Sequence, residues 1–102
     1  MGEPAGSGPG FLRPVLIVQS NEFNGSAIRT TICAAVASNL RLAEAPGNVR
    51  LTEKASGLSQ ESVVNVSQLI TLDTRLLTGR VGRVPAATLR DVKAGIKLVL
   101  AI

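Results

Sequence analysis

The apolar run that follows Arg13 and Pro14 constrains the fold of this chain more than any other stretch. Pro14 has a fixed φ and disfavours a helical conformation for the residue before it, so Arg13 should stand at the entrance of an extended segment. The residues that follow are Val15, Leu16, Ile17 and Val18. Such a compact β-branched and apolar run is typical of a buried strand, and we expect one over residues 13–20. This strand would hold the arginine in a fixed place.

The composition of the chain limits what it can form. A length of 102 residues suits one compact domain with one core. Apolar residues make up 45% of the chain, yet Phe11 and Phe23 are its only aromatic residues, so Val, Leu, Ile and Ala must build the core. The net charge of +4 favours anionic partners such as nucleic acid. From the charge alone, a soluble basic surface with no such partner is the favoured explanation.

The single cysteine and the apolar runs bear on the environment of the protein. Cys33 has no second cysteine with which to pair, and its apolar neighbours indicate a small buried side chain, with a reactive thiol as the alternative. No apolar run approaches the ~20 residues that a bilayer span needs, and the N-terminus lacks the basic and apolar segments of a signal peptide. We therefore expect a cytoplasmic protein that does not contact a membrane.

Short strands dominate the expected secondary structure. Residues 1–12 are rich in Gly and Pro and should form a flexible, irregular arm. The strand over 13–20 should form a hairpin-like pair with the next strand. The remaining expected elements are a turn over 21–27, strands over 28–37, 48–53, 62–69 and 79–84, a loop over 54–60, and a short helical turn over 75–77 that Asp73 or Thr74 caps.

A helix is expected at the C-terminal end, from Pro85 to about Leu100. Its apolar residues recur at helical spacing and form one stripe: Leu89, Val92, Ile96, Val99 and Leu100. We interpret the basic residues on its other side, Arg90, Lys93 and Lys97, as a solvated face. Strands followed by a terminal helix predict a mainly β fold, either a small curved sheet or a partly open barrel closed by the helix.

Further information comes from several short sequence blocks taken together. They include Arg-Pro-Val from Arg13 and Ser-Asn from Ser38, and they cover residues 13–19, 23–24, 38–41, 46–49, 57–58, 62–68, 71–73 and 81–82. In order and spacing these blocks resemble the MazF/PemK family of toxin endoribonucleases, and the resemblance runs from about Gly6 to the end. It implies a single MazF/PemK-like domain over residues 1–102, with a small SH3-like fold of the PemK/CcdB type.

The resemblance also implies an activity and its partners. Members of the family are homodimers that cut single-stranded RNA, including mRNA, at short sequences without a metal, and a cognate MazE-like antitoxin blocks their RNA groove. No cofactor is implied. The residues of this chain agree with that expectation, since it has no histidine for acid–base catalysis and no cluster of His and Cys for a metal.

Candidate site residues follow from the same resemblance. In the family, the ribose 2′-OH attacks the neighbouring phosphate, and the arginine of the Arg-Pro-Val motif acts with a threonine at the end of the following strand. That arginine corresponds to Arg13, whose planar, permanently charged guanidinium suits a phosphate that gains negative charge. Ser38, Asn39 and Gln68 stand where the RNA groove would lie and are candidate RNA-binding residues. Turn formation or hydrogen bonding at a sheet edge is the alternative role for such polar residues.

The chain departs from the family pattern at three places. Ala37 occupies the usual threonine position, and its methyl group cannot donate a hydrogen bond. Gly8 stands where an acidic residue is common, and the usual first strand of the family is absent. Ser38 is a candidate substitute for the missing hydroxyl, although adjacent strand residues point to opposite faces.

These departures leave three hypotheses open. The first is a metal-independent endoribonuclease, attenuated because Ala37 and Gly8 replace two of its usual groups. The second is a catalytically inactive relative that binds RNA or an antitoxin. The third is a decaying gene product that barely folds without its first strand.

Overall fold

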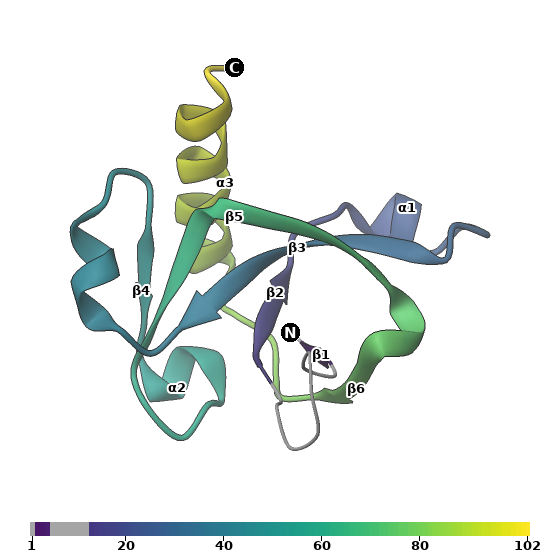
Figure 1. Ribbon diagram of the computed structural model, residues 1–102, viewed down its shortest axis with the longest axis horizontal. Helices are drawn as coiled ribbons and strands as arrows, with labels where there is room; N and C mark the ends of the chain where they lie inside the picture. The colour runs from purple at the N-terminus through teal and green to yellow at the C-terminus, as the bar shows by residue number, and fades with distance from the viewer. Residues whose placement is uncertain (1, 5–12) are drawn as a thin grey trace.

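The computed structural model describes residues 2–4 and 13–102, and it shows a curled antiparallel sheet with a C-terminal helix (Figure 1). The sheet has six strands in the order β4-β5-β3-β2-β1-β6. The strands are β1 Gly2–Pro4, β2 Val15–Ile17, β3 Thr30–Ala37, β4 Val49–Leu51, β5 Ser62–Asp73 and β6 Leu77–Arg80. The helical segments are α1 Asn21–Asn24, η1 Leu40–Glu44, α2 Glu53–Ser56, η2 Thr74–Leu76 and α3 Ala86–Leu100. The mainly β fold with a terminal helix is confirmed.

The curl of the sheet depends on a bulge in the long strand β5. Opposite β3, Ala34 pairs with Leu69 but Ala35 pairs with Asn65, so the bulge consists of the intervening residues 66–68. A side-chain amide stabilises the bulge, because the Asn48 Oδ1 accepts a hydrogen bond of 2.9 Å from the N–H of Val66. Extra residues on one strand bend it and increase its twist. Strand β5 therefore pairs with β4 at its start and curves away with β3 towards η2 (Figure 1).

The main core lies between the sheet and α3 and is aliphatic, as the composition required. Its buried members are Leu16, Ala34, Val36, Leu51, Val64, Val66, Val84 and Val92. The predicted helix is confirmed, and Pro85 lies at its N-cap position, where its missing N–H is no loss. Of the residues predicted for the apolar stripe, Val92 is buried, whereas Val99 and Leu100 are exposed near the C-terminus. None of the helices in the described residues has the length and hydrophobicity of a membrane span.

The close packing of α3 depends on two glycines. Gly95 is buried in α3 and faces Gly47, which adopts a φ of +85° in the turn before β4. A Cβ atom on Gly95 would overlap the carbonyl oxygen of Gly47. The missing side chains therefore let the helix backbone touch the turn that carries Asn48 and, through it, the bulge of β5.

The N-terminal residues differ from their expected structure. Residues 1–12 were predicted to be an irregular arm, but Gly2–Pro4 form β1, which lies between β2 and β6 and pairs antiparallel with both. Partners on both sides provide tertiary pairing that outweighs the low strand propensity of Gly and Pro. The sheet therefore continues beyond β2 through β1 to β6. Residues 1 and 5–12 lie outside the described part of the chain.

Short helices replace some of the expected turns and loops. The predicted turn over 21–27 contains α1, and the predicted loop over 54–60 begins with part of α2. In α2 the Thr52 hydroxyl caps the first turn by accepting a hydrogen bond from the N–H of Ala55. The last strand is β6 at Leu77–Arg80 and not residues 79–84. The hairpin-like pairing of β2 with β3 and the Asp73 cap on η2 are confirmed.

Cys33 is fully buried in β3, which confirms the expected small buried side chain. Burial raises the pKa of the Cys33 thiol to about 11, and the reactive thiolate is therefore suppressed at neutral and mildly alkaline pH. We expect a thiol reagent such as DTNB to leave the native protein unmodified at pH 8 and to react with one thiol per chain in denaturant. Rapid labelling of the native protein would contradict this assignment.

Candidate nucleic-acid cleft

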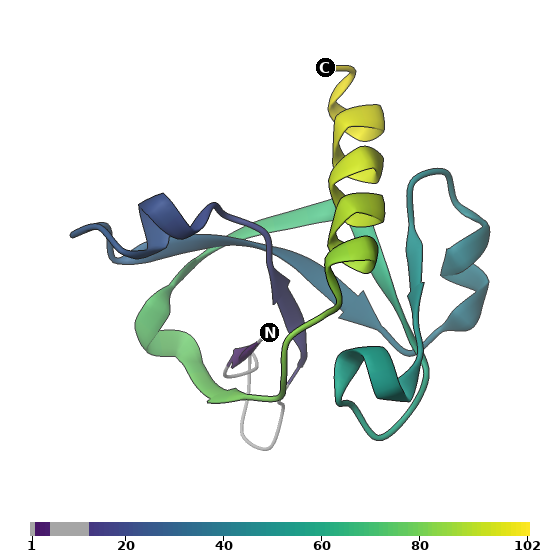
Figure 2. The same cartoon turned by 180° about the vertical axis from the view of Figure 1, so that it is seen from behind.

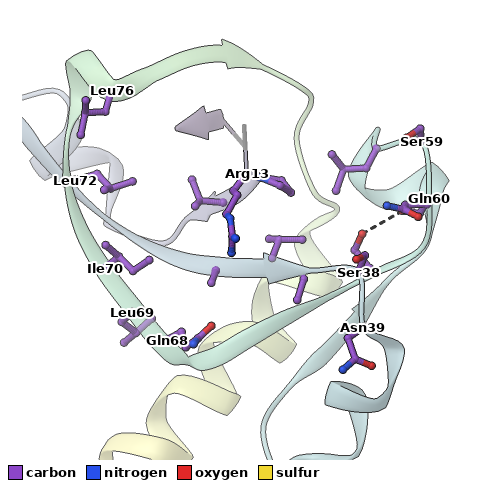
Figure 3. A pocket seen from close by; sticks show the side chains of 17 residues that line it. Arg13, Ser38, Asn39, Ser59, Gln60, Gln68, Leu69, Ile70, Leu72 and Leu76 are labelled. Carbon is purple, nitrogen blue, oxygen red and sulfur yellow. Dashed lines mark hydrogen bonds between the residues drawn. The ribbon is translucent and has the colours of Figure 1, made fainter. Parts of the chain in front are cut away.

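An open cleft of about 1350 Å³ lies inside the curl of β5 (Figure 3). One wall is apolar and carries Leu69, Ile70 and Leu72 of β5 with Leu76 of η2. The other residues that line the cleft are mostly small or polar: Arg13, Pro14, Val15, Ala35, Val36, Ala37, Ser38, Asn39, Leu58, Ser59, Gln60, Ser62 and Gln68. All the candidate site residues that the structure describes are therefore brought together in this cleft. Gly8 lies outside the described residues.

Strand register sets Arg13 against the end of β3. Val15 pairs with Ala35, and the N–H of Val36 donates to the carbonyl oxygen of Pro14 at 3.3 Å. Continuing this antiparallel register from Val15 and Ala35 by two residues on each strand places Arg13 opposite Ala37. Residues directly opposite share one face of a sheet and have neighbouring side chains. Figure 3 shows the exposed Arg13 side chain pointing towards β3 within the cleft.

Ser38 and Asn39 follow the last residue of β3. Both side chains are exposed and line the cleft, because the strand ends at Ala37 and strict alternation no longer applies. The Asn39 Oδ1 accepts a hydrogen bond of 3.1 Å from the N–H of Arg41 and so caps η1. Asn39 therefore has a structural role as a helix cap, the kind of role that sequence analysis gave as the alternative to RNA binding.

Gln68 belongs to the β5 bulge and is exposed. Figure 3 shows it on the rim of the cleft, at the bend of β5. Within the bulge, the Asn65 Oδ1 accepts hydrogen bonds from the Ser67 hydroxyl at 2.7 Å and from the Ser67 N–H at 3.3 Å. The bulge therefore presents Gln68 from a backbone that side-chain amides hold in place.

The sequence did not predict the polar wall opposite Gln68, which consists of Ser59, Gln60 and Ser62. Ser59 and Gln60 lie in the loop between α2 and β5, Ser62 begins β5, and the Ser62 hydroxyl donates to the carbonyl oxygen of Gln60 at 3.1 Å. Ser and Gln in a loop carry no local signal for a binding site. Only the pairing of β5 with β3 brings this loop beside Ala37 and Ser38.

The electrostatics of the cleft are simple. Arg13 is the one charged side chain among its described lining residues. An ion pair lies nearby at η2, where the Arg75 guanidinium donates to Asp73 at 2.8 Å. The side-chain and backbone hydrogen bonds from Arg75 lower the pKa of the Asp73 carboxyl to about 2. Across residues 2–4 and 13–102, no group of three or more His, Cys, Asp and Glu residues is placed to hold a metal ion.

The fold of this chain is shared by solved structures of other proteins. The chain superposes on the Mycobacterium tuberculosis toxin MazF-mt6 with a TM-score of 0.82 at 19% identity, covering 100% of this chain and 98% of the other. It superposes on a MazE–MazF structure from Deinococcus radiodurans with a TM-score of 0.79 at 23% identity, covering 98% and 89%. The curled sheet with its C-terminal helix is therefore the MazF toxin fold.

The sequence comparisons identify the family. Residues 1–100 match the family described as the PemK-like, MazF-like toxin of type II toxin-antitoxin systems. The chain is 45% identical over 100 residues to a Mycobacterium tuberculosis protein named endoribonuclease MazF6, covering 98% of this chain and 88% of that protein. The protein belongs to the PemK-like, MazF-like toxin family, as its sequence blocks indicated.

Proposed function

We propose that this protein is a toxin-family endoribonuclease that binds single-stranded RNA, including mRNA, in the Arg13 cleft and cleaves it without a metal. The observation that carries the proposal is that Arg13, the one charged side chain among the described residues of the cleft, lies opposite Ala37 when the register of β2 with β3 is continued past Val15 and Ala35. A guanidinium can neutralise one phosphate, and amides and hydroxyls can contact riboses and bases. We assign RNA contacts to Arg13, Ser38, Asn39 and Gln68.

In the proposed reaction, the ribose 2′-oxygen loses its proton and bonds to the adjacent phosphorus. The bond from that phosphorus to the 5′-oxygen of the next nucleotide breaks, and the leaving oxygen takes up a proton. Arg13 donates hydrogen bonds to the non-bridging oxygens as their negative charge grows. It remains protonated throughout and does not serve as the base. Ala37 has no hydroxyl to assist either step, so we propose that cleavage is slow.

A second candidate function is binding of RNA or an antitoxin without cleavage. The methyl side chain of Ala37, opposite Arg13, favours it, because the site then has a phosphate-binding group and no positioned hydroxyl beside it. The two candidates differ in one observable. Both predict that RNA binds, but only the first predicts products.

The remaining proposals concern the oligomeric state, the partner and the cellular location of the protein. We propose one toxin-family domain over residues 1–102, acting in the cytoplasm as a homodimer that a cognate MazE-like antitoxin inhibits. Support for the antitoxin comes from the solved MazE–MazF structure of the same fold. Support for the homodimer comes from exposed apolar side chains at the end of α3, including Leu98, Leu100 and Ile102.

Replacement of Arg13 by Ala tests the proposed function. We expect the rate of cleavage of a mixed-sequence RNA in EDTA to fall by about 10²–10³-fold, since a donor to the developing charge is lost. RNA affinity, measured by fluorescence anisotropy, should fall as well. Arg90→Ala is the matched control, because Arg90 is exposed on α3 and does not line this cleft.

The outcomes separate the two candidate functions. Cleavage by the native chain that Arg13→Ala alone reduces supports the endoribonuclease. RNA binding that depends on Arg13 with no products at any protein concentration supports the binding relative. Equal effects of Arg13→Ala and Arg90→Ala on RNA binding would overturn both assignments of the cleft.

A further inference from the structure

Asn48 is held in place by a tight turn between η1 and β4. Its N–H donates to the carbonyl oxygen of Ala45 at 3.2 Å, and Pro46 and Gly47 occupy the two central positions. The φ of +85° at Gly47 is the conformation that a type II turn requires at its second central position. Figure 2 shows η1 and β4 side by side, with α3 next to the turn that joins them. The backbone of Asn48 therefore has a fixed position.

The side-chain amide of Asn48 joins η1 to the bulge of β5. Its Nδ2 donates to the carbonyl oxygen of Leu42 in η1 at 2.8 Å, and its Oδ1 accepts from the N–H of Val66 at 2.9 Å. Val66 is fully buried and lies in the stretch of β5 that has no partner residue in β3. Buried backbone N–H groups need an acceptor. The amide therefore supplies the acceptor that strand pairing does not provide at this point.

Each end of this connection leads to a residue of the Arg13 cleft. Asn39 lines the cleft and caps η1, the element that carries the carbonyl group of Leu42. Gln68 lines the cleft two residues after Val66, within the bulge. Asn48 itself is not among the described residues that line the cleft. One side-chain amide outside the cleft therefore ties the bulge that carries Gln68 to the element that begins at Asn39.

The carboxamide of Gln68 depends on the bulge for its position. Within residues 2–4 and 13–102 this carboxamide has no hydrogen-bond partner, and Figure 3 shows it at the bend of β5. A carboxamide presents one acceptor oxygen and two donor hydrogens, which suit a base edge or a ribose hydroxyl. Because no bond of its own holds this side chain, the backbone of the bulge determines where it lies.

We infer that Asn48 is a positioning residue of the Arg13 cleft, which holds Gln68 where its carboxamide contacts RNA. The inference rests on the proposed function, because that function assigns an RNA contact to Gln68. Without the amide of Asn48 the bulge is released from η1, while the pairing of β5 with β3 and β4 on either side remains. Variants at Asn48 should therefore fold and lose the contribution of Gln68 to RNA binding.

A double-mutant cycle of Asn48→Ala and Gln68→Ala tests the inference. The probe is a short mixed-sequence oligonucleotide with 2′-O-methylated riboses, which has no free 2′-hydroxyl to attack a phosphate, and fluorescence anisotropy measures its affinity. Each single replacement should lower the affinity about fivefold, the usual effect of one hydrogen bond. The double variant should also lose about fivefold, because Asn48 acts through Gln68, whereas independent effects would multiply to about 25-fold.

Asn24→Ala is the matched control for a general loss of stability. The Asn24 Nδ2 donates to the carbonyl oxygen of Gln19 at 3.1 Å, and its Oδ1 accepts from the Thr31 hydroxyl at 2.9 Å, so this replacement also removes donated and accepted hydrogen bonds. Asn24 does not line the Arg13 cleft, and its replacement should change the RNA affinity less than about twofold. If circular dichroism shows that Asn48→Ala is unfolded, Asn48→Ser repeats the cycle with an uncharged side chain too short to bond both elements.

The outcomes separate this inference from the proposed function. Binding that Arg13→Ala weakens, with equal losses in the two single variants and the double variant, supports both. If Arg13→Ala weakens binding but Asn48→Ala does not, or if the two losses multiply in the double variant, the inference alone is overturned. Equal losses in Asn48→Ala and Asn24→Ala overturn it too, because they would indicate a general effect of stability. Absence of oligonucleotide binding by the native chain overturns both the proposed function and the inference.

Discussion

Replacement of Ala37 by Thr is expected to raise the rate of RNA cleavage by about 10²-fold, the usual effect of one positioned hydrogen-bonding group. Ala37 is half-buried at the end of β3, lines the open Arg13 cleft, and lies opposite Arg13 in the strand register. A threonine suits this strand position, and its hydroxyl would share a face of the sheet with the guanidinium. Initial rates on a mixed-sequence RNA in EDTA measure the effect.

Ala37→Val is the matched control for that experiment. Valine has the branched shape of threonine but no hydroxyl, so it should leave the cleavage rate within about twofold of the native rate. RNA affinity should change little in both variants, because Arg13 remains. If Ala37→Thr and Ala37→Val have equal rates, the hydroxyl is not the missing group, and the assignment of Ala37 as the cause of slow cleavage fails.

Local sequence signals predicted some elements well and others poorly. The α3 helix has a starting proline and a 3.6-residue apolar period, and the strand after Pro14 has a continuous apolar run; each of these signals is local. Strand β5 continues to Asp73 because residues 70–73 pair with the start of β3. Strand β1 exists because β2 and β6 flank it. Such pairings join distant segments, and no local pattern encodes them.

The residues of the candidate site divide in the same way, into those that the sequence marked and those that only the fold brings to the cleft. The resemblance to the family marked Arg13, Ala37, Ser38 and Asn39, and the structure brings them to one cleft. It could not mark the loop with Ser59 and Gln60, whose place depends on the pairing of β5 with β3.

Replacement of Gly95 by Ala is expected to destabilise the protein by about 2 kcal/mol. The new methyl group would overlap the carbonyl oxygen of Gly47, which belongs to the backbone and cannot rotate away as a flexible side chain could. Overpacking of this kind costs up to ~3 kcal/mol, and the better helix propensity of alanine offsets ~1 kcal/mol of that cost. The expected fall in Tm is about 10 °C for a domain of this size.

Gly79→Ala is the control, because a Cβ at Gly79 meets no atom within 4 Å. It should change the free energy of unfolding by less than about 0.5 kcal/mol in urea melts followed by circular dichroism. The turn that Gly95 touches also carries Asn48, which holds the β5 bulge beside Gln68. Displacement of α3 by Gly95→Ala should therefore also weaken RNA binding in the folded protein, measured well below the Tm. If the Tm of Gly95→Ala equals that of the native protein, α3 does not pack on this turn.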